Sequence, residues 1–229
     1  MKINRLALRL CMCALVLLRA LSLYADGKDS LSRKMIHMAG IDVKPAYVFP
    51  THEFFAGNNA TFSPIRKNLS VHLKYGFKFA PDTYFGRMYP HAVQGIGVGY
   101  NTFFHSSELG NPWSVYAFQT SRIASLTPRL SLDYEWNFGA SFGWKKYDAE
   151  SNPYNRVVGS KMNAYIHLSF LLNWQLDAQT NLRAGIGATH FSNGNTGYPN
   201  AGVNAFGASI GLTRYFGAVS YTHLRAHET

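Results

Sequence analysis

The chain has 229 residues, 22 Lys and Arg against 12 Asp and Glu, and a formal net charge of +10 at pH 7. The basic residues are scattered along the sequence, which argues against nucleic acid as a partner and leaves anionic lipid head groups or a solvated surface as explanations. Aromatic residues make up 15% of the chain, and its only two cysteines are Cys11 and Cys13.

The first 25 residues are typical of a secretory signal peptide. Three basic residues open an apolar run that ends near Leu23, and Ala25 precedes the expected cleavage site. A membrane-spanning helix is the alternative, but the run is short and contains Arg19. Cleavage removes four basic residues and both cysteines, so the exported chain carries 18 basic against 12 acidic residues and has no disulfide or thiol chemistry.

Alternation of apolar and polar residues predicts strands along most of the remaining chain. It is clearest over 130–144, where the even positions are mainly apolar and the odd positions are polar or glycine and include Asp133 and Glu135. Acids opposite an apolar face are unusual in a soluble sandwich and ordinary in a membrane barrel with a polar interior. Seven further segments are expected to be strands: 40–49, 69–79, 96–100, 113–122, 164–174, 181–192 and 203–216.

These segments predict an all-β fold, an antiparallel transmembrane β-barrel of about eight strands over residues 26–218, located in the outer membrane. The expected outer loops are 50–68, 105–112, 145–160 and 193–202, and the expected inner turns are 123–129 and 177–180. The segment 81–94 is too long for an inner turn and counts against this scheme. Under the scheme Ser192 lies at the outer end of an ascending strand, in the leaflet that holds lipopolysaccharide.

The last eleven residues, 219–229, look like the translation of a sequencing-library adapter. We expect them to be foreign and the natural chain to continue past Ala218. The two histidines of this tail, His223 and His227, are therefore not interpreted as metal ligands, despite their spacing.

The strand over 181–192 places two chemically active residues on one face. Its even positions from Leu182 to Ala188 are apolar, and His190 and Ser192 continue the same parity. Residues i and i+2 of a strand share a face, so both side chains are expected on the outside of the barrel, toward lipid. The loop 193–202 returns the chain beside them, which brings Asn204 near the pair.

This arrangement suits acyl transfer. Histidine, with a reference pKa of about 6.5, can take the proton of a serine hydroxyl near neutral pH. Asn204 could orient the ring, while Asn193, Asn200 or the loop amides near Gly194 could stabilise an oxyanion. The alternative is that these residues are merely interfacial, because polar residues and Asn-Gly turns are common at a barrel rim. No metal motif is present, and we expect no metal or other cofactor.

The most specific pattern of the chain consists of His190, Phe191, Ser192 and Asn193, followed by Pro199, Asn200 and Gly202. It resembles the motif of the PagL-type lipid A 3-O-deacylases and of the related outer-membrane acyloxyacyl hydrolases, and the resemblance extends over about residues 36–217. It implies an eight-stranded outer-membrane barrel with an external active site that hydrolyses an ester-linked acyl chain of lipid A without a metal. It also implies Ser192 as nucleophile, His190 as general base and Asn200 at the oxyanion position.

One position departs from the family pattern, since the family has an acid where this chain has Asn204. An amide can hold an imidazole but cannot stabilise an imidazolium by charge, so slower turnover is expected and the acyl position stays open. The leading hypothesis is therefore a lipid A deacylase that acts on lipopolysaccharide. The alternatives are a non-catalytic structural or small-pore barrel, which would use lumen residues such as Lys74, Glu135 and His167, and an adhesin or lipopolysaccharide-binding module that uses the outer loops.

Overall fold

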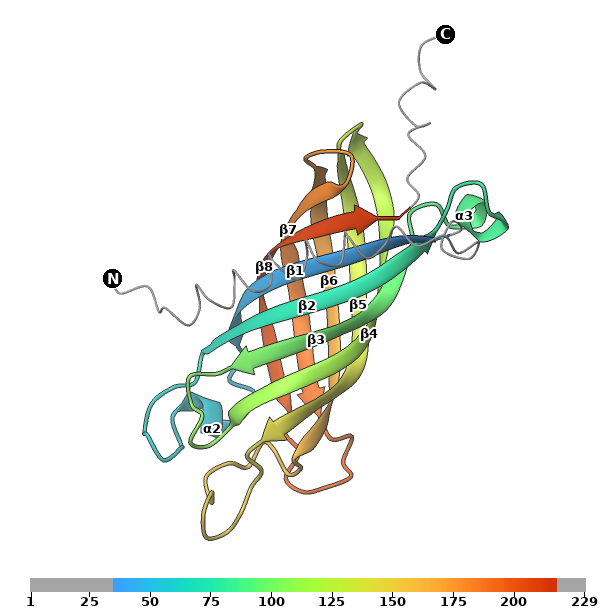
Figure 1. The fold of residues 1–229 in the computed structure, drawn as a ribbon. Helices are drawn as coiled ribbons and strands as arrows, with labels where there is room; N and C mark the ends of the chain where they lie inside the picture. The colour runs from blue at the N-terminus through green and yellow to red at the C-terminus, as the bar shows by residue number, and fades with distance from the viewer. Residues whose placement is uncertain (1–34, 218–229) are drawn as a thin grey trace, which may run out of the picture.

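The computed structural model describes residues 35–217, which form a closed barrel of eight antiparallel strands (Figure 1). Each strand pairs with its sequence neighbours, and β8 closes the barrel against β1. The strands are β1 (Met35–Val48), β2 (Lys67–Phe79), β3 (Val93–Thr102), β4 (Gly110–Thr127), β5 (Leu130–Trp144), β6 (Met162–Gln175), β7 (Thr180–Ser192) and β8 (Val203–Phe216). The predicted all-β class and strand number are confirmed. The predicted signal segment 1–25 and foreign tail 219–229 lie outside the described residues.

Two short helices lie in the connections between strands: α2 (Glu53–Ala56) and α3 (Tyr84–Met88). Within residues 35–217, no helix is long and apolar enough to cross a membrane.

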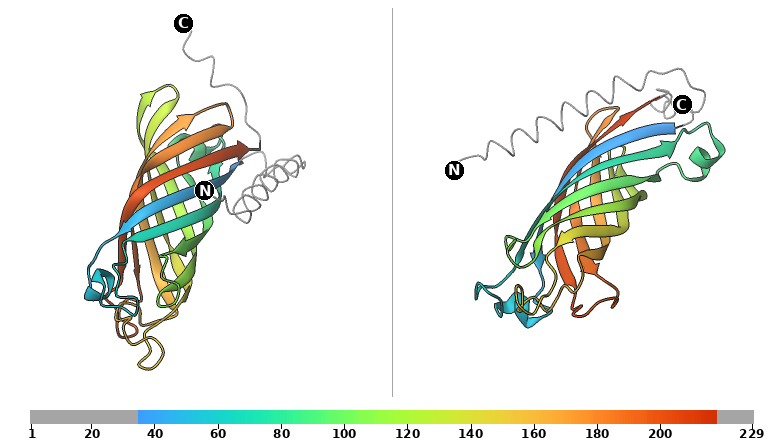
Figure 2. Two further views of the ribbon diagram at one scale, coloured as in Figure 1. Left: turned by 90° about the vertical axis from the view of Figure 1, so that its left-hand side faces the viewer. Right: turned by 60° about the horizontal axis from the view of Figure 1, so that its bottom comes forward.

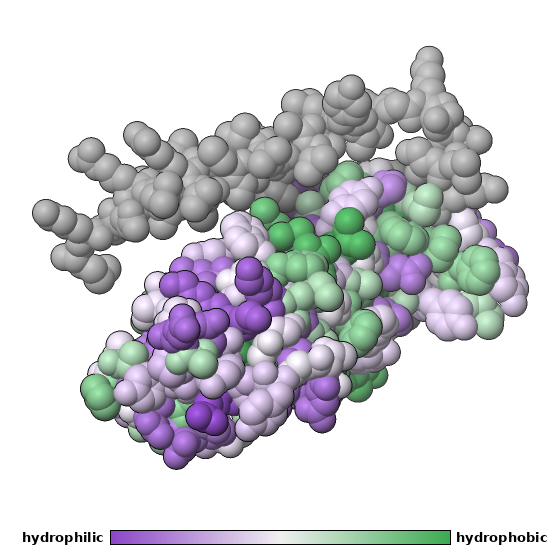
Figure 3. All heavy atoms as spheres, turned by 90° about the horizontal axis from the view of Figure 1, so that it is seen from below, coloured by the Kyte–Doolittle hydropathy of each residue, from purple (hydrophilic) through white to green (hydrophobic). Residues whose placement is uncertain are grey.

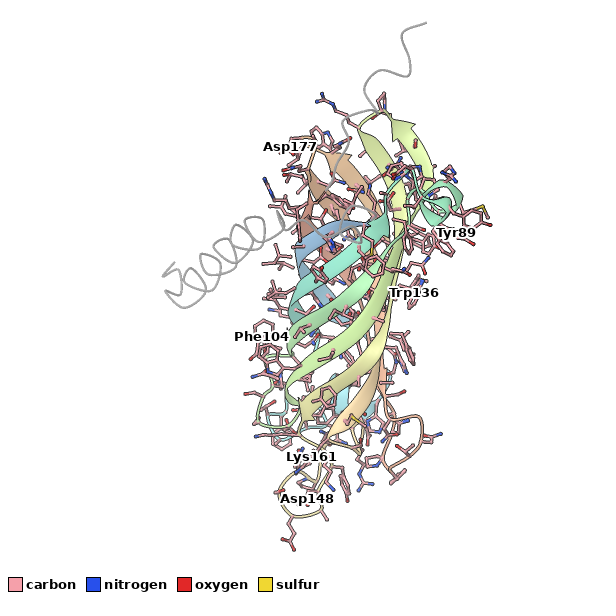
Figure 4. The ribbon with its side chains drawn as sticks, turned by 45° about the vertical axis from the view of Figure 1, so that its right-hand side comes forward. Tyr89, Phe104, Trp136, Asp148, Lys161 and Asp177 are labelled. Carbon is pink, nitrogen blue, oxygen red and sulfur yellow. The ribbon has the colours of Figure 1, made fainter. Side chains whose placement is uncertain are left out.

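The two faces of the barrel wall have opposite polarity. Apolar side chains such as Ile96 and Phe138 point outward and are 63% and 60% exposed, whereas Glu135 is 1% exposed. Trp136 projects from the outer wall in Figure 4, and Figure 3 shows hydrophobic residues on the wall beside a hydrophilic loop surface. Exposed apolar side chains over several strands form the lipid-facing belt of a membrane barrel, as the alternation predicts.

A network of buried charges fills the interior. Lys74 lies between Asp42 and Glu135, with its Nζ 2.9 Å from Glu135 Oε2. Arg183 also binds Glu135, and the Thr120 hydroxyl donates to the same carboxylate at 2.9 Å. Because these side chains come from five strands, the network ties opposite parts of the wall together. An eight-stranded barrel has an interior just wide enough for such side chains to fill.

The connections differ in length at the two ends of the barrel (Figure 2). One end, the turn end, carries the turns 128–129 and 176–179 and the connection 80–92. The other, the loop end, carries the loops 49–66, 103–109, 145–161 and 193–202. The predicted turn 123–129 is shorter than expected, because β4 extends to Thr127 through two irregularities in its pairing with β5.

The long segment that counted against the scheme folds on itself. Residues 80–92 contain α3, which is capped by Thr83, whose Oγ1 accepts a hydrogen bond from Gly86 N at 3.0 Å. Thr83 Oγ1 also donates to the carbonyl of Ala80 at 2.7 Å. A capped helical turn satisfies its own backbone groups, so this connection is compatible with a position at the turn end.

In the strand predicted over 130–144, the expected orientation of one residue, Trp144, is wrong. Trp144 has the even parity of the outward face, yet it is buried. The preceding Gly143 has φ +88°, a conformation that interrupts the alternation and turns the indole inward. There Trp144 Nε1 donates to Ser141 Oγ at 2.8 Å, and the ring packs against Phe103 and Phe191.

We expect Glu135→Ala to lower the free energy of unfolding by about 3 kcal/mol, because it leaves Lys74 and Arg183 buried with too little negative charge. Denaturant titration of the protein in lipid vesicles measures the change. The exposed loop residue Glu150 provides the control, since Glu150→Ala should change stability by less than about 0.5 kcal/mol. Equal effects of the two substitutions would contradict this role of the network.

Candidate functional site

The candidate site lies where β7 ends and β8 begins, at the loop end of the barrel. His190 and Asn204 are directly paired across the two strands. His190 Nδ1 lies 2.7 Å from Asn204 Oδ1, which is a hydrogen bond with the ring nitrogen as donor when the proton is on Nδ1. The amide oxygen accepts this proton, so His190 Nε2 is left free to act as a base. The hairpin thus brings Asn204 to His190 as the sequence predicts.

Phe191 holds this strand end in position. It is 1% exposed and packs inward against Trp144, Tyr165 and Phe103, with centroid distances of 5.1, 5.4 and 6.2 Å. Because the side chains of a strand alternate between its faces, an inward Phe191 directs His190 and Ser192 to the outward face. Both are half-buried. The buried aromatic cluster therefore sets which face of the barrel carries the candidate site.

Ser192 lies beside Ala164 of β6, at the last position of β7. In the described part of the chain, no hydrogen bond joins its hydroxyl to His190. Catalytic hydrogen bonds are often formed only once a substrate is bound, so a shared face and close position are the relevant observations.

Gly202 lies next to His190 and Ser192. It has φ +70°, and its amide donates to the Val157 carbonyl at 3.2 Å. A Cβ at this position would lie 3.0 Å from Phe191 O, 3.3 Å from His190 Cε1 and 3.7 Å from Ser192 Cβ. Only glycine meets both demands without strain. The sequence motif contains Gly202, but nothing in the pattern alone indicates its contact with the imidazole.

The predicted oxyanion residues hold the loop 193–202 together. The backbone N–H of Asn193 donates to Asn200 Oδ1 at 3.1 Å, and the side-chain Nδ2 of Asn193 donates to the Gly197 carbonyl at 2.7 Å. Asn200 Nδ2 donates to Asn195 Oδ1 at 3.1 Å. Each side-chain amide has two N–H groups, so Asn193 and Asn200 each keep one further donor. Gly194 has φ +62° and open space around its α-carbon.

Among residues 35–217, no three His, Cys, Asp or Glu side chains are grouped so that they could hold a metal ion. Two residues near the site were not predicted from the sequence. His52 and Arg156 come from other loops and line a pocket beside Asn200. No local pattern marks them, because only the folded loops bring them there.

The chain matches the family model of the lipid A 3-O-deacylases (PagL) over residues 53–213. The crystal structure of the outer membrane enzyme PagL has a TM-score of 0.52 at 12% identity, over 75% of this chain and 97% of that chain. The crystal structure of Neisserial surface protein A has a TM-score of 0.48 at 9% identity, over 80% of this chain and 96% of that chain. The N-terminal barrel domain of Pseudomonas aeruginosa OprF has a TM-score of 0.44 at 7% identity, over 80% of this chain and 98% of that chain. Among curated proteins, none matches the sequence.

The fold and its lipid-facing belt define a small outer-membrane β-barrel. Since the family model covers well over half of the sequence, the chain belongs to the lipid A 3-O-deacylase (PagL) family, a family of hydrolases. In outer-membrane barrels the short turns face the periplasm and the long loops face the exterior. The loop end, with Ser192, therefore lies at the outer leaflet.

We expect Gly202→Ala to lower the free energy of unfolding by about 1–2 kcal/mol and to move the His190 ring, because the new methyl group meets Cε1 in a strained backbone conformation. The position of the His190 Hε1 signal in two-dimensional NMR of detergent-solubilised protein measures the movement. Gly194→Ala is the matched control, since its φ is also positive but no atom lies within 4 Å of the new Cβ. A similar signal shift in both variants would contradict the contact.

Proposed function

We propose that this protein is an outer-membrane serine ester hydrolase that removes an ester-linked acyl chain from the lipid A of lipopolysaccharide. The observation that carries the proposal is the hydrogen bond of His190 to Asn204 on the same outward face that bears Ser192. Family membership supports lipid A as the substrate. A site on the lipid-facing edge at the outer leaflet suits a substrate whose acyl chains lie in the membrane.

In the proposed reaction His190 Nε2 takes the Ser192 hydroxyl proton as Oγ forms a bond to the ester carbonyl carbon. The tetrahedral intermediate collapses, the bond from the carbonyl carbon to the alcohol oxygen of the ester breaks, and the imidazolium returns the proton to that oxygen. Water then attacks the acyl-serine while His190 takes a proton from the water. Release of the fatty acid returns the proton to Ser192.

Asn204 would act as a positioning residue in this scheme. Its Oδ1 accepts the Nδ1 proton and holds the base in the useful tautomer, as the acid of a serine triad does. It supplies no negative charge to the imidazolium that forms when Ser192 is deprotonated. The geometric part of the triad's role is therefore kept and the electrostatic part is lost.

The oxyanion would be stabilised at the loop 193–202. The candidate donors are the side-chain N–H groups of Asn193 and Asn200 and the backbone near Gly194. Asn193 and Gly194 follow directly on the nucleophile, and Asn200 is hydrogen-bonded to Asn193. The hydrogen bonds between Asn193, Asn200 and Asn195 fix these groups before substrate arrives. Preorganised donors stabilise developing charge without a cost of reorganisation.

A small pore is less well supported than hydrolysis. The buried Lys74, Glu135 and Arg183 are bound to one another across the interior, so the lumen is occupied by protein. The non-catalytic alternative then reduces to a structural barrel, which gives no reason for a hydrogen-bonded histidine beside a serine on the lipid-facing edge.

Ser192→Ala should reduce release of fatty acid from lipopolysaccharide by more than about a thousandfold, because it removes the proposed nucleophile. Mass spectrometry of lipid A after incubation with the purified barrel measures the loss of one acyl mass and identifies the chain. Ser107→Ala in an exposed loop is the control and should leave the rate unchanged. Release that persists in a folded Ser192→Ala barrel would overturn the proposal.

Asn204→Glu should raise kcat by about tenfold or more, because a carboxylate accepts the same proton and also stabilises the imidazolium. The acid limb of the pH–rate profile should move to higher pH, since the new charge favours the protonated ring. Asn204→Ala serves as comparison and should lower kcat, as the ring loses its acceptor. A glutamate variant no faster than the parent, with an unmoved profile, would contradict the role given to Asn204.

A further inference from the structure

A pocket of about 280 Å³ opens among the outer loops beside the candidate site. It is formed by three loops that are far apart in the sequence: 49–66, 145–161 and 193–202. Figure 4 shows Asp148 and Lys161 of the middle loop at this end of the barrel. The pocket is lined by His52, Arg156, Asn195, Tyr198, Pro199, Asn200 and Ala201.

The pocket presents hydrogen-bond donors and a positive charge, and no acidic side chain lines it. His52 Nδ1 accepts the amide hydrogen of Phe54 at 3.1 Å, so a neutral ring carries its proton on Nε2 and offers it as a donor. Arg156 packs its guanidinium 5.7 Å from the Tyr147 ring centroid and forms no salt bridge within the described chain. A guanidinium without a carboxylate partner is well suited to a phosphate group.

The pocket is continuous with the candidate catalytic edge. Asn200 belongs to both, because it lines the pocket and holds the Asn193 amide at the end of β7. Ala201 lines the pocket as well, and the next residue, Gly202, lies against His190 and Ser192. The loops themselves are in close contact, since a Cβ on Gly159 would lie 2.4 Å from the Pro199 carbonyl oxygen. A ligand held in the pocket is therefore held next to the hydrolytic residues.

We propose that this pocket binds a phosphate group on the sugar head group of the substrate, with Arg156 as the main anion contact and His52 as a second donor. The inference rests on the proposed function, because it identifies the part of a phosphorylated glycolipid that the loops recognise. The membrane side of the site then receives the acyl chain, while the loop side positions the sugar head group of the same lipid.

The test measures binding in place of turnover. Ser192→Ala protein in lipid nanodiscs is titrated with lipid A and with the same lipid after chemical removal of its phosphates. We expect at least tenfold tighter binding of the phosphorylated lipid. When Arg156→Gln is added, the ratio of the affinities for the two lipids should fall close to one. Lys161→Gln, which removes an exposed loop cation outside the pocket, is the matched control and should keep the preference.

An equal affinity for both lipids, or an unchanged preference in the Arg156→Gln protein, would overturn the inference. Arg156→Lys, which keeps the charge but not the planar fork, should retain part of the preference and provides a second folded variant. Binding of inorganic phosphate as tight as that of lipid A would assign the pocket to the free ion instead of the lipid. Because Ser192 is absent from the binding arm, a failure of hydrolysis and a failure of phosphate recognition give separate results.

Discussion

The alternation of side chains at the end of β7 is the constraint on which the site depends. Phe191 must point inward, because its ring completes the buried cluster with Trp144, Tyr165 and Phe103. His190 and Ser192 then have only the outer face available, where they lie among lipid-facing neighbours. A packing requirement of the interior thus decides which face of the barrel carries the candidate site.

The charges in the lumen enforce the same register over the whole barrel. A shift of one residue in any strand would exchange its faces and move groups such as Lys74 or Glu135 into lipid. The ion pairs of Lys74 and Arg183 with Glu135 form only in the observed register, so they stabilise it against such a shift. The polar interior therefore contributes to the site without touching it, since it prevents β7 and β8 from presenting the wrong residues.

Much of this arrangement follows from local patterns in the sequence. A period of two residues identifies the strands, and a ten-residue hairpin loop suffices to bring Asn204 opposite His190. Prediction fails where backbone conformation breaks the period, as Gly143 does before Trp144. It also fails for His52 and Arg156, because contacts between three loops depend on the closed barrel and have no periodic signal.

The amide of Asn204 has a consequence that a carboxylate would not have. A carboxylate is symmetric about its bond to the side chain, so a half-turn leaves an oxygen facing the imidazole. A half-turn of Asn204 replaces that oxygen with an N–H donor and moves the ring proton to the nitrogen that must stay bare. In the proposed mechanism, the fraction of molecules with a bare His190 Nε2 is therefore set by an equilibrium between two Asn204 rotamers, which depends on the surroundings of the amide nitrogen.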